Sequence, residues 1–153
     1  MAGTLTTPDP SVMRHLVPPS LGRPLANYSH AVEIEAGSRL LFLSGQLATR
    51  PDGSVPDGAA AQAALIFENI AAILAEAGMT MADIVRLNAY LTDRADLAAY
   101  MAARDRVVAS PPPASTLLLV QGFSRPEFKV EIEVVAARQD DPSGLPSNPS
   151  GLQ

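Results

Sequence analysis

The sequence predicts a single α+β domain in which one β-sheet carries two helices on one face. Its 153 residues are the length of one domain. Two segments have helical periodicity, and about five have the alternation or apolar runs of strands, in the order β-β-α-β-α-β-β. Because two helices cover only one face of a sheet, the other face is solvated or packs against another subunit. Its apolar content favours a subunit interface in a closed ring.

The two ends of the chain lack these patterns. Residues 1–24 contain prolines at positions 8, 10, 18, 19 and 24, so we expect an irregular arm. Residues 139–153 are rich in Asp, Pro, Ser and Gly, a composition that predicts a disordered tail. The folded domain is therefore expected to span residues 25–138.

The first two predicted strands are expected to form a hairpin. Residues 27–35 end in an alternation of apolar residues and glutamates, which is typical of a half-buried strand. Residues 40–46 begin with four apolar residues and end in Ser-Gly-Gln, which indicates a buried strand followed by a turn. Residues 36–39 are a short connection between them.

Two helices are predicted, at about residues 59–77 and 93–108. The first carries an apolar stripe, with Asp57 placed to cap its start and Gly78 placed to end it. Three prolines after Ser110 stop the second helix.

The remaining strands are predicted at residues 83–91, 114–120 and 128–136. In the last of these, Glu131 and Glu133 share the face opposite the valines and the isoleucine.

The composition excludes several classes of function. With no cysteine and two histidines, the chain has no disulfide, thiolate nucleophile or histidine-rich metal site, so no cofactor or metal is predicted. A net charge of −5 argues against nucleic acid as the main partner. No apolar run approaches the ~18 residues of a membrane span, and no secretory signal is visible, so a cytoplasmic protein is expected.

Ser44-Gly45-Gln46 is the first candidate site. It places a hydroxyl, a backbone without a side chain and an amide in a row, and glycine lets another group approach the main chain. We hypothesise a small-molecule pocket here; alternatively, the motif only ends a strand. Glu131 is either solvated, which the strand pattern favours, or a functional acid or base with a raised pKa.

Three further residues could contact a ligand. Tyr28 could donate its hydroxyl or line a rim, and Ser115 and Thr116 could present hydroxyls or simply be strand-end residues. No Ser-His-acid triad order and no phosphate-binding glycine loop are found.

Five segments then occur in a familiar order and spacing. They are Tyr28-Ser29-His30-Ala31-Val32, Leu43-Ser44-Gly45-Gln46, Asp83-Ile84-Val85, Pro113-Ala114-Ser115-Thr116 and Lys129-Val130-Glu131-Ile132-Glu133. With them the chain resembles the RidA family, also called YjgF or Endoribonuclease L-PSP, over about residues 25–138. The resemblance implies a chorismate-mutase-like fold and a homotrimer with substrate clefts between subunits. Its best-known members hydrolyse enamines and imines such as 2-aminoacrylate without a cofactor.

The resemblance also implies roles for individual residues. Tyr28 matches the tyrosine at the mouth of the cleft, Ser44 and Gly45 match the strand motif, and Glu131 matches the glutamate that orients water. The arginine that binds the substrate carboxylate falls on Ser115, and an asparagine of the second helix falls on Met101. Since serine cannot bind a carboxylate bidentately, we expect a specificity unlike that of the 2-aminoacrylate deaminases. Arg86 or Arg104 could replace the arginine.

The sequence therefore predicts a cofactor-free enzyme that acts on a small imine or enamine. Glu131 would position water or move a proton, while Ser44 and either Ser115 or Thr116 would bind the substrate. A tautomerase or cyclase using the same cleft, or a non-catalytic trimer that binds a metabolite or a protein, are the alternatives. The acidic chain, with both histidines near its N-terminus, argues against a ribonuclease.

Overall fold

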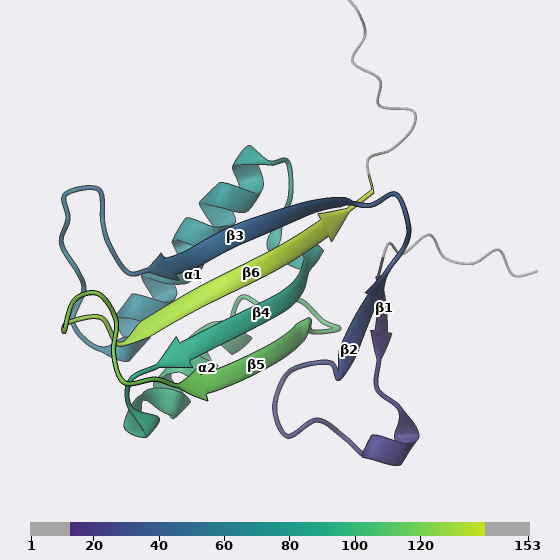
Figure 1. Ribbon diagram of the computed structural model, residues 1–153, viewed down its shortest axis with the longest axis horizontal. Helices are drawn as coiled ribbons and strands as arrows, with labels where there is room; N and C mark the ends of the chain where they lie inside the picture. Colours follow the sequence, from purple (N-terminus) through teal and green to yellow (C-terminus); the bar gives the residue numbers. More distant parts are fainter. Residues whose placement is uncertain (1–12, 140–153) are drawn as a thin grey trace, which may run out of the picture.

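The computed structural model describes residues 13–139, which form a four-stranded sheet backed by two helices and a separate two-stranded sheet (Figure 1). The strands are β1 (Met13–Leu16), β2 (Ala31–Ile34), β3 (Arg39–Leu47), β4 (Ile84–Leu91), β5 (Ala114–Leu119) and β6 (Val130–Arg138). The α-helices are α1 (Ala59–Glu76) and α2 (Leu97–Asp105), and short 3-10 helices span Pro19–Leu21, Met81–Asp83 and Arg94–Asp96.

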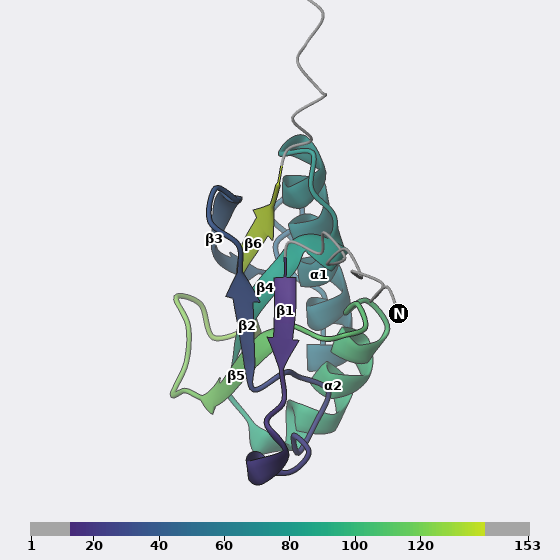
Figure 2. The same cartoon turned by 90° about the vertical axis from the view of Figure 1, so that its right-hand side faces the viewer.

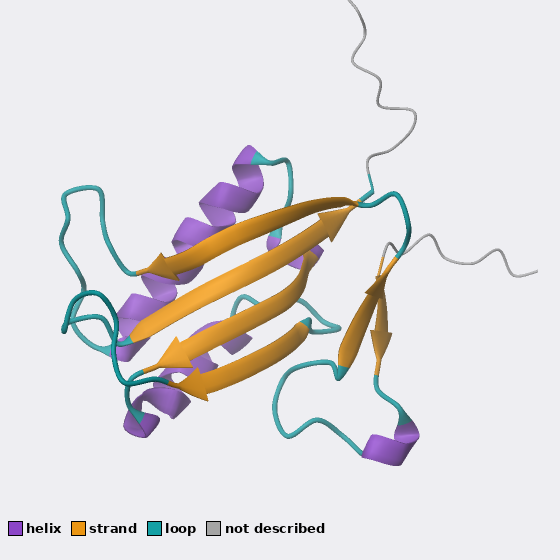
Figure 3. Cartoon of the chain, viewed as in Figure 1, coloured by secondary structure: helices purple, strands orange, loops and turns teal. Residues whose placement is uncertain are grey.

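The larger sheet is mixed and has the strand order β3-β6-β4-β5. Strand β6 pairs antiparallel with β3 and with β4, while β4 and β5 run parallel. Helix α1 lies behind β3 and β6, and α2 lies behind β4 and β5 (Figures 1 and 3). Seen from the side, both helices are on one face of the sheet (Figure 2). The predicted α+β arrangement is confirmed, and we call the uncovered face of this sheet the open face.

The core fills the space between the helices and the sheet. Alternate residues of β6, among them Val130 and Ile132, are fully buried and meet the apolar stripe of α1, which includes Ile66 and Ile70. By length and composition, α1 is the one described helix that could cross a membrane. Because its apolar stripe packs into this core, we interpret α1 as a core helix.

The predicted hairpin is wrong. Strand β2 pairs with β1, with Met13 opposite Ile34, whereas β3 pairs with β6. The chain around Met13–Leu16 is therefore a strand and not part of an irregular arm. Strand β3 has a buried apolar side and needs the equally apolar β6, while the short β2 exposes Glu33 and needs only one neighbour. The rest of the predicted arm before residue 13, and the predicted tail after residue 139, lie outside the described residues.

The C-terminal end of α1 is as predicted from the sequence, whereas its N-terminal cap is not. Gly78 has a φ of 68°, as expected for the glycine that follows a helix. Asp57 does not cap the helix, because the N-cap is Gly58 and no side chain caps it. Instead the buried Gln62 donates from Nε2 to the backbone oxygens of Pro56 (3.1 Å) and Glu127 (2.8 Å), which ties two loops to the start of α1.

Candidate active site

A β-bulge lies at the centre of the Ser-Gly-Gln motif. Leu43 is opposite Val134 and Gln46 is opposite Ile132, so Ser44 and Gly45 together face the single residue between Val134 and Ile132. The strand continues to Leu47, which contradicts the alternative that the motif only ends a strand. The Gln46 side chain donates from Nε2 to the Ser44 carbonyl (3.0 Å), so it supports the backbone of the bulge.

The carboxylate of Glu131 lies directly against Gly45. A Cβ atom at Gly45 would overlap Glu131 Oε1 and lie 2.9 Å from its Cδ. The close approach expected at this glycine is therefore present, and the approaching group is the Glu131 side chain. Only a residue without a side chain leaves room for it.

The environment of the Glu131 carboxylate leaves it available to a ligand. Among residues 13–139 it makes no hydrogen bond or ion pair. Partial burial raises the pKa of Glu131 above its ordinary value, and the charge of Glu133 raises it further. Such a group is suited to accept a proton from a bound water molecule.

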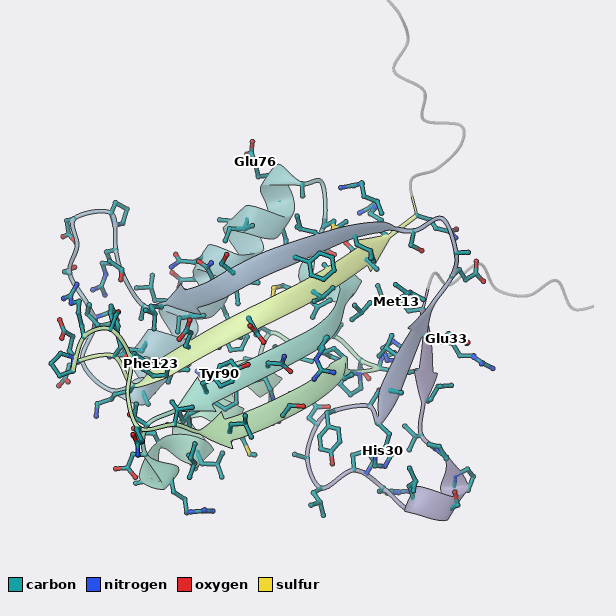
Figure 4. The ribbon with its side chains drawn as sticks, viewed as in Figure 1. Met13, His30, Glu33, Glu76, Tyr90 and Phe123 are labelled. Carbon is teal, nitrogen blue, oxygen red and sulfur yellow. The ribbon has the colours of Figure 1, made fainter. Side chains whose placement is uncertain are left out.

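Glu133 has the opposite environment. Its Oε1 accepts hydrogen bonds from Asn88 Nδ2 and from the Tyr90 hydroxyl, both at 2.8 Å. These bonds, first that of Asn88 and then that of Tyr90, lower the pKa of Glu133. Tyr90 lies on the open face near the end of β4 (Figure 4). Glu133 is therefore held ionised and in place on β6.

A second group of candidate residues gathers around the start of β5. Ser29 is buried and donates from its hydroxyl to the Pro112 carbonyl (2.6 Å) and from its backbone to Pro113 (2.9 Å). His15 Nδ1 on β1 lies 2.9 Å from the same Pro112 oxygen and 3.2 Å from the Ser29 hydroxyl. These contacts fix Tyr28, the residue before Ser29, relative to β5. No local sequence pattern indicates this junction, because its members are far apart in the chain.

Tyr28 contacts the neighbouring histidine. The rings of Tyr28 and His30 meet edge to face with their centres 5.9 Å apart, and His30 lies on the segment leading into β2 (Figure 4). This contact orients the tyrosine without occupying its hydroxyl.

Comparison with known proteins identifies the family. The family model described as Endoribonuclease L-PSP matches residues 20–138. The chain belongs to this family, the RidA family. The protein DfrA of Myxococcus xanthus is 36% identical over 111 residues, which cover 71% of this chain and 83% of that protein. TdcF of Escherichia coli K12, provisionally named a reactive intermediate deaminase, is 34% identical over 111 residues, covering 69% of this chain and 83% of TdcF.

Solved structures of the RidA family have the same fold. The Rid family protein YyfB from Yersinia pestis, described as of unknown function, superposes with a TM-score of 0.73 at 31% identity, covering 84% of this chain and 100% of that one. The crystal structure of E. coli TdcF with bound serine gives 0.61 at 29% identity, covering 76% and 91%. The chorismate-mutase-like fold that the resemblance implied is thereby confirmed.

The two positions that depart from the RidA pattern lie on the helix side of the sheet. Ser115 shares the face of β5 with Leu117, which packs against the core, and Met101 on α2 is a half-buried neighbour of that core. Thr116 lies on the open face and accepts a 3.5 Å hydrogen bond from Arg86. The side chains of Ser115 and Thr116, which are adjacent in sequence, therefore lie on opposite faces of the sheet.

One chain does not bring the RidA site residues together. Ser115 is opposite Leu87 and Leu87 is opposite Val134, three residues from Glu131. At ~3.3 Å per residue and ~4.8 Å per strand, the Cα atoms of Ser115 and Glu131 are about 14 Å apart. Their side chains also point to opposite faces. Ser44, Gly45 and Glu131 lie together on β3 and β6, and we call them the first half-site. We group the remaining residues that match the family pattern as the second half-site: Tyr28, Met101 and Ser115.

The two arginines considered as substitutes differ in availability. Arg104 is 4% exposed and forms a 2.7 Å ion pair with Asp105. Arg86 is exposed, contacts Thr116 and has no acidic partner at ion-pair distance among residues 13–139. Arg86 is thus the free cation of the two. Within the same residues, no group of three or more His, Asp or Glu side chains could hold a metal ion.

Proposed function

We propose that this chain is a cofactor-free RidA-type hydrolase that converts a small imine or enamine to a carbonyl compound and ammonia or an amine. The observation that carries the proposal is the Glu131 carboxylate, which lies against Gly45, has a raised pKa and has no hydrogen-bond partner among residues 13–139. Glu131 would accept a proton from water as the water oxygen attacks the imine carbon, and that proton then passes to the leaving nitrogen.

A homotrimer would complete the site. The two half-sites of one chain face different ways, so a cleft containing both needs a half-site from a second copy. The open face also exposes large apolar side chains, with Leu40 44%, Phe42 72% and Leu118 51% exposed. Burial of these side chains against other copies supplies the driving force for assembly. The small substrate would enter at the subunit boundary, and location in the cytoplasm stays a prediction.

The substrate would differ from 2-aminoacrylate. Ser115 offers a neutral hydroxyl where the family has a guanidinium, and Met101 makes that corner of the cleft more apolar. An imine without a carboxylate needs no cation and gains from an apolar wall. The relative TdcF, crystallised with serine, supports binding of a small molecule in this family.

Two sets of imines test this proposal. An amino-acid oxidase generates imines that carry a carboxylate, an amine oxidase generates imines that lack one, and semicarbazide traps whatever imine remains. We expect the wild-type protein to clear the second set faster than the first, and Glu131→Ala to clear neither. Faster clearance of the carboxylate set would contradict the proposed specificity. Failure to clear either set would contradict imine hydrolysis.

Ser115 also supports a second candidate, a trimer that binds a metabolite or a protein partner without turnover. Such a protein is expected to lack a substrate-binding arginine. It does not need the Glu131 carboxylate held against Gly45, so this contact favours the hydrolase. A bound metabolite would survive Glu131→Ala, while turnover would not. A tautomerase or cyclase would use the same proton-accepting carboxylate and would show turnover without release of ammonia or an amine.

A further inference from the structure

A small pocket opens on the open face between β3, β6 and β4. Its volume is about 170 Å³, and the open-face side chains that line it are Phe42, Arg86, Asn88, Glu133 and Val135. We call it the Glu133 pocket. It is smaller than the ~300–1,000 Å³ of pockets for drug-sized ligands, so it suits a molecule of a few heavy atoms.

The Glu133 pocket is lined by a cation, Arg86, and an anion, Glu133, that form no ion pair with each other. Both hydrogen bonds to Glu133 are accepted by Oε1, which leaves Oε2 without a partner among the described residues. Within residues 13–139, the guanidinium of Arg86 makes one hydrogen bond, at 3.5 Å to the Thr116 hydroxyl. No ion pair joins these two side chains, although both line the pocket. Space for a ligand thus lies between a cation and an anion.

We propose that the Glu133 pocket binds a small zwitterion, an α-amino acid, whose carboxylate contacts Arg86 and whose ammonium group contacts Glu133 Oε2. A guanidinium matches a carboxylate with two parallel N–H donors, and a carboxylate oxygen is the natural acceptor for an ammonium group. Phe42 and Val135 are apolar walls against which a short aliphatic side chain packs. A molecule with only one of the two charges would leave the other pocket group unpaired.

The electrostatics of the pocket favour such a ligand. The bonds from Asn88 and Tyr90, with the charge of Arg86, hold the pKa of Glu133 below its ordinary value, so the anion is present at neutral pH. In a trimer, a facing subunit would cover the pocket and exclude water, which strengthens both charge contacts. Neither Glu131 nor imine chemistry takes part, so this inference does not depend on the proposed hydrolysis and shares with it only the trimer.

Isothermal titration of the full-length protein in its native assembly tests the proposal with L-alanine as the probe. Propionate lacks the ammonium group and ethylamine lacks the carboxylate, and both have the same carbon skeleton apart from the missing group. We expect L-alanine to bind at least about tenfold more tightly than either, since each lost charge-assisted contact has roughly that effect. Equal binding of propionate would overturn the proposal in favour of an anion site at Arg86. Absence of L-alanine binding at millimolar concentration would overturn it altogether.

Substitutions then locate the binding. Arg86→Gln and Glu133→Gln should each weaken L-alanine binding about tenfold, because each removes one of the two charges. Glu133→Gln also keeps the size of the side chain. Arg86→Lys keeps the cation and should retain the preference for L-alanine over ethylamine, even if assembly changes. Arg94→Gln is the matched control, since Arg94 is an exposed arginine outside the pocket. Unchanged binding by both Gln variants would place the zwitterion elsewhere and overturn the assignment.

Discussion

Glu131 and Glu133 lie two residues apart on the same face of β6 and have opposite surroundings. Glu133 accepts two hydrogen bonds from β4, and its pKa is lowered. Glu131 lies over a glycine on β3, makes no hydrogen bond among the described residues, and its pKa is raised. One oxygen of Glu133 is engaged by two hydrogen bonds, whereas neither oxygen of Glu131 has a partner among residues 13–139. The chemistry of a strand residue is therefore set by its cross-strand neighbours.

The largest effect expected from this difference is on turnover. Glu131→Gln keeps the shape of the side chain and removes its basicity, so imine hydrolysis should fall by about 10²–10⁴-fold. Glu133→Gln should change the rate far less, because Glu133 is already engaged with Asn88 and Tyr90. Steady-state rates on the better imine set measure both variants. Equal losses would remove the functional distinction between the two glutamates.

A methyl group at Gly45 should nearly reproduce the loss of Glu131. The added Cβ would overlap the Glu131 carboxylate and push it aside. A displacement of about 1 Å in a reacting group can cost about 100-fold in rate. Stability should change little, because the displaced atoms are the free end of a side chain.

Gly122→Ala is the control for this substitution, since a Cβ there meets nothing within 4 Å. Normal turnover by Gly45→Ala would show that the position of Glu131 against Gly45 is irrelevant to the reaction.

The smallest expected effect is on the stability of the folded protein at neutral pH, where Glu131→Gln and Glu133→Gln should act in opposite directions. Because the pKa of Glu131 is raised in the folded protein, the stability contributed by its protonated form is fully present below pH 4.5. This stability is lost as the pH rises through the folded pKa, whereas the neutral Gln resembles the protonated form at every pH. Glu131→Gln should therefore stabilise the protein slightly at neutral pH. Glu133 has a lowered pKa, so its contribution is present above 4.5 and is lost as the pH falls through the folded value.

Glu133→Gln should accordingly destabilise at neutral pH by up to about 1 kcal/mol, a modest value because the group is partly exposed. Urea unfolding of both variants at neutral pH and below pH 4.5 measures these effects. Both differences from wild type should shrink at the lower pH. If both substitutions changed the free energy of unfolding in the same direction at neutral pH, the opposite environments assigned to Glu131 and Glu133 would be contradicted.

Much of this architecture was predictable from local patterns, and the contrast between the two glutamates was not. Alternation predicted that Glu131 and Glu133 share a face, and the glycine in the Ser-Gly-Gln motif predicted a close approach. Their different environments depend on the register of β6 against β3 and β4, which places Asn88 opposite Glu133 and creates the bulge at Gly45. Pairing register between distant segments is not encoded in the periodicity of either one.

The lack of information on long-range pairing also explains why strand β1 was not predicted and β2 was paired with the wrong strand. Strand β1 has four residues among prolines, too few to show a period, and it forms only because β2 and the turn before β5 lie beside it. The junction of His15, Ser29 and Pro112 joins segments that are up to 97 residues apart. Pattern arguments that work within ten residues do not reach such contacts.

The most direct measurement is a carboxyl-carbon NMR titration of wild-type protein labelled in its glutamate side chains, with the Gln variants used to assign the two signals. We predict that Glu131 titrates above the ordinary value of 4.5 and Glu133 below it. Tyr90→Phe should narrow the gap by raising the pKa of Glu133, because one of its two hydrogen bonds is lost. A pKa of Glu131 at or below that of Glu133 would contradict the central claim that β6 carries one free and one engaged carboxylate.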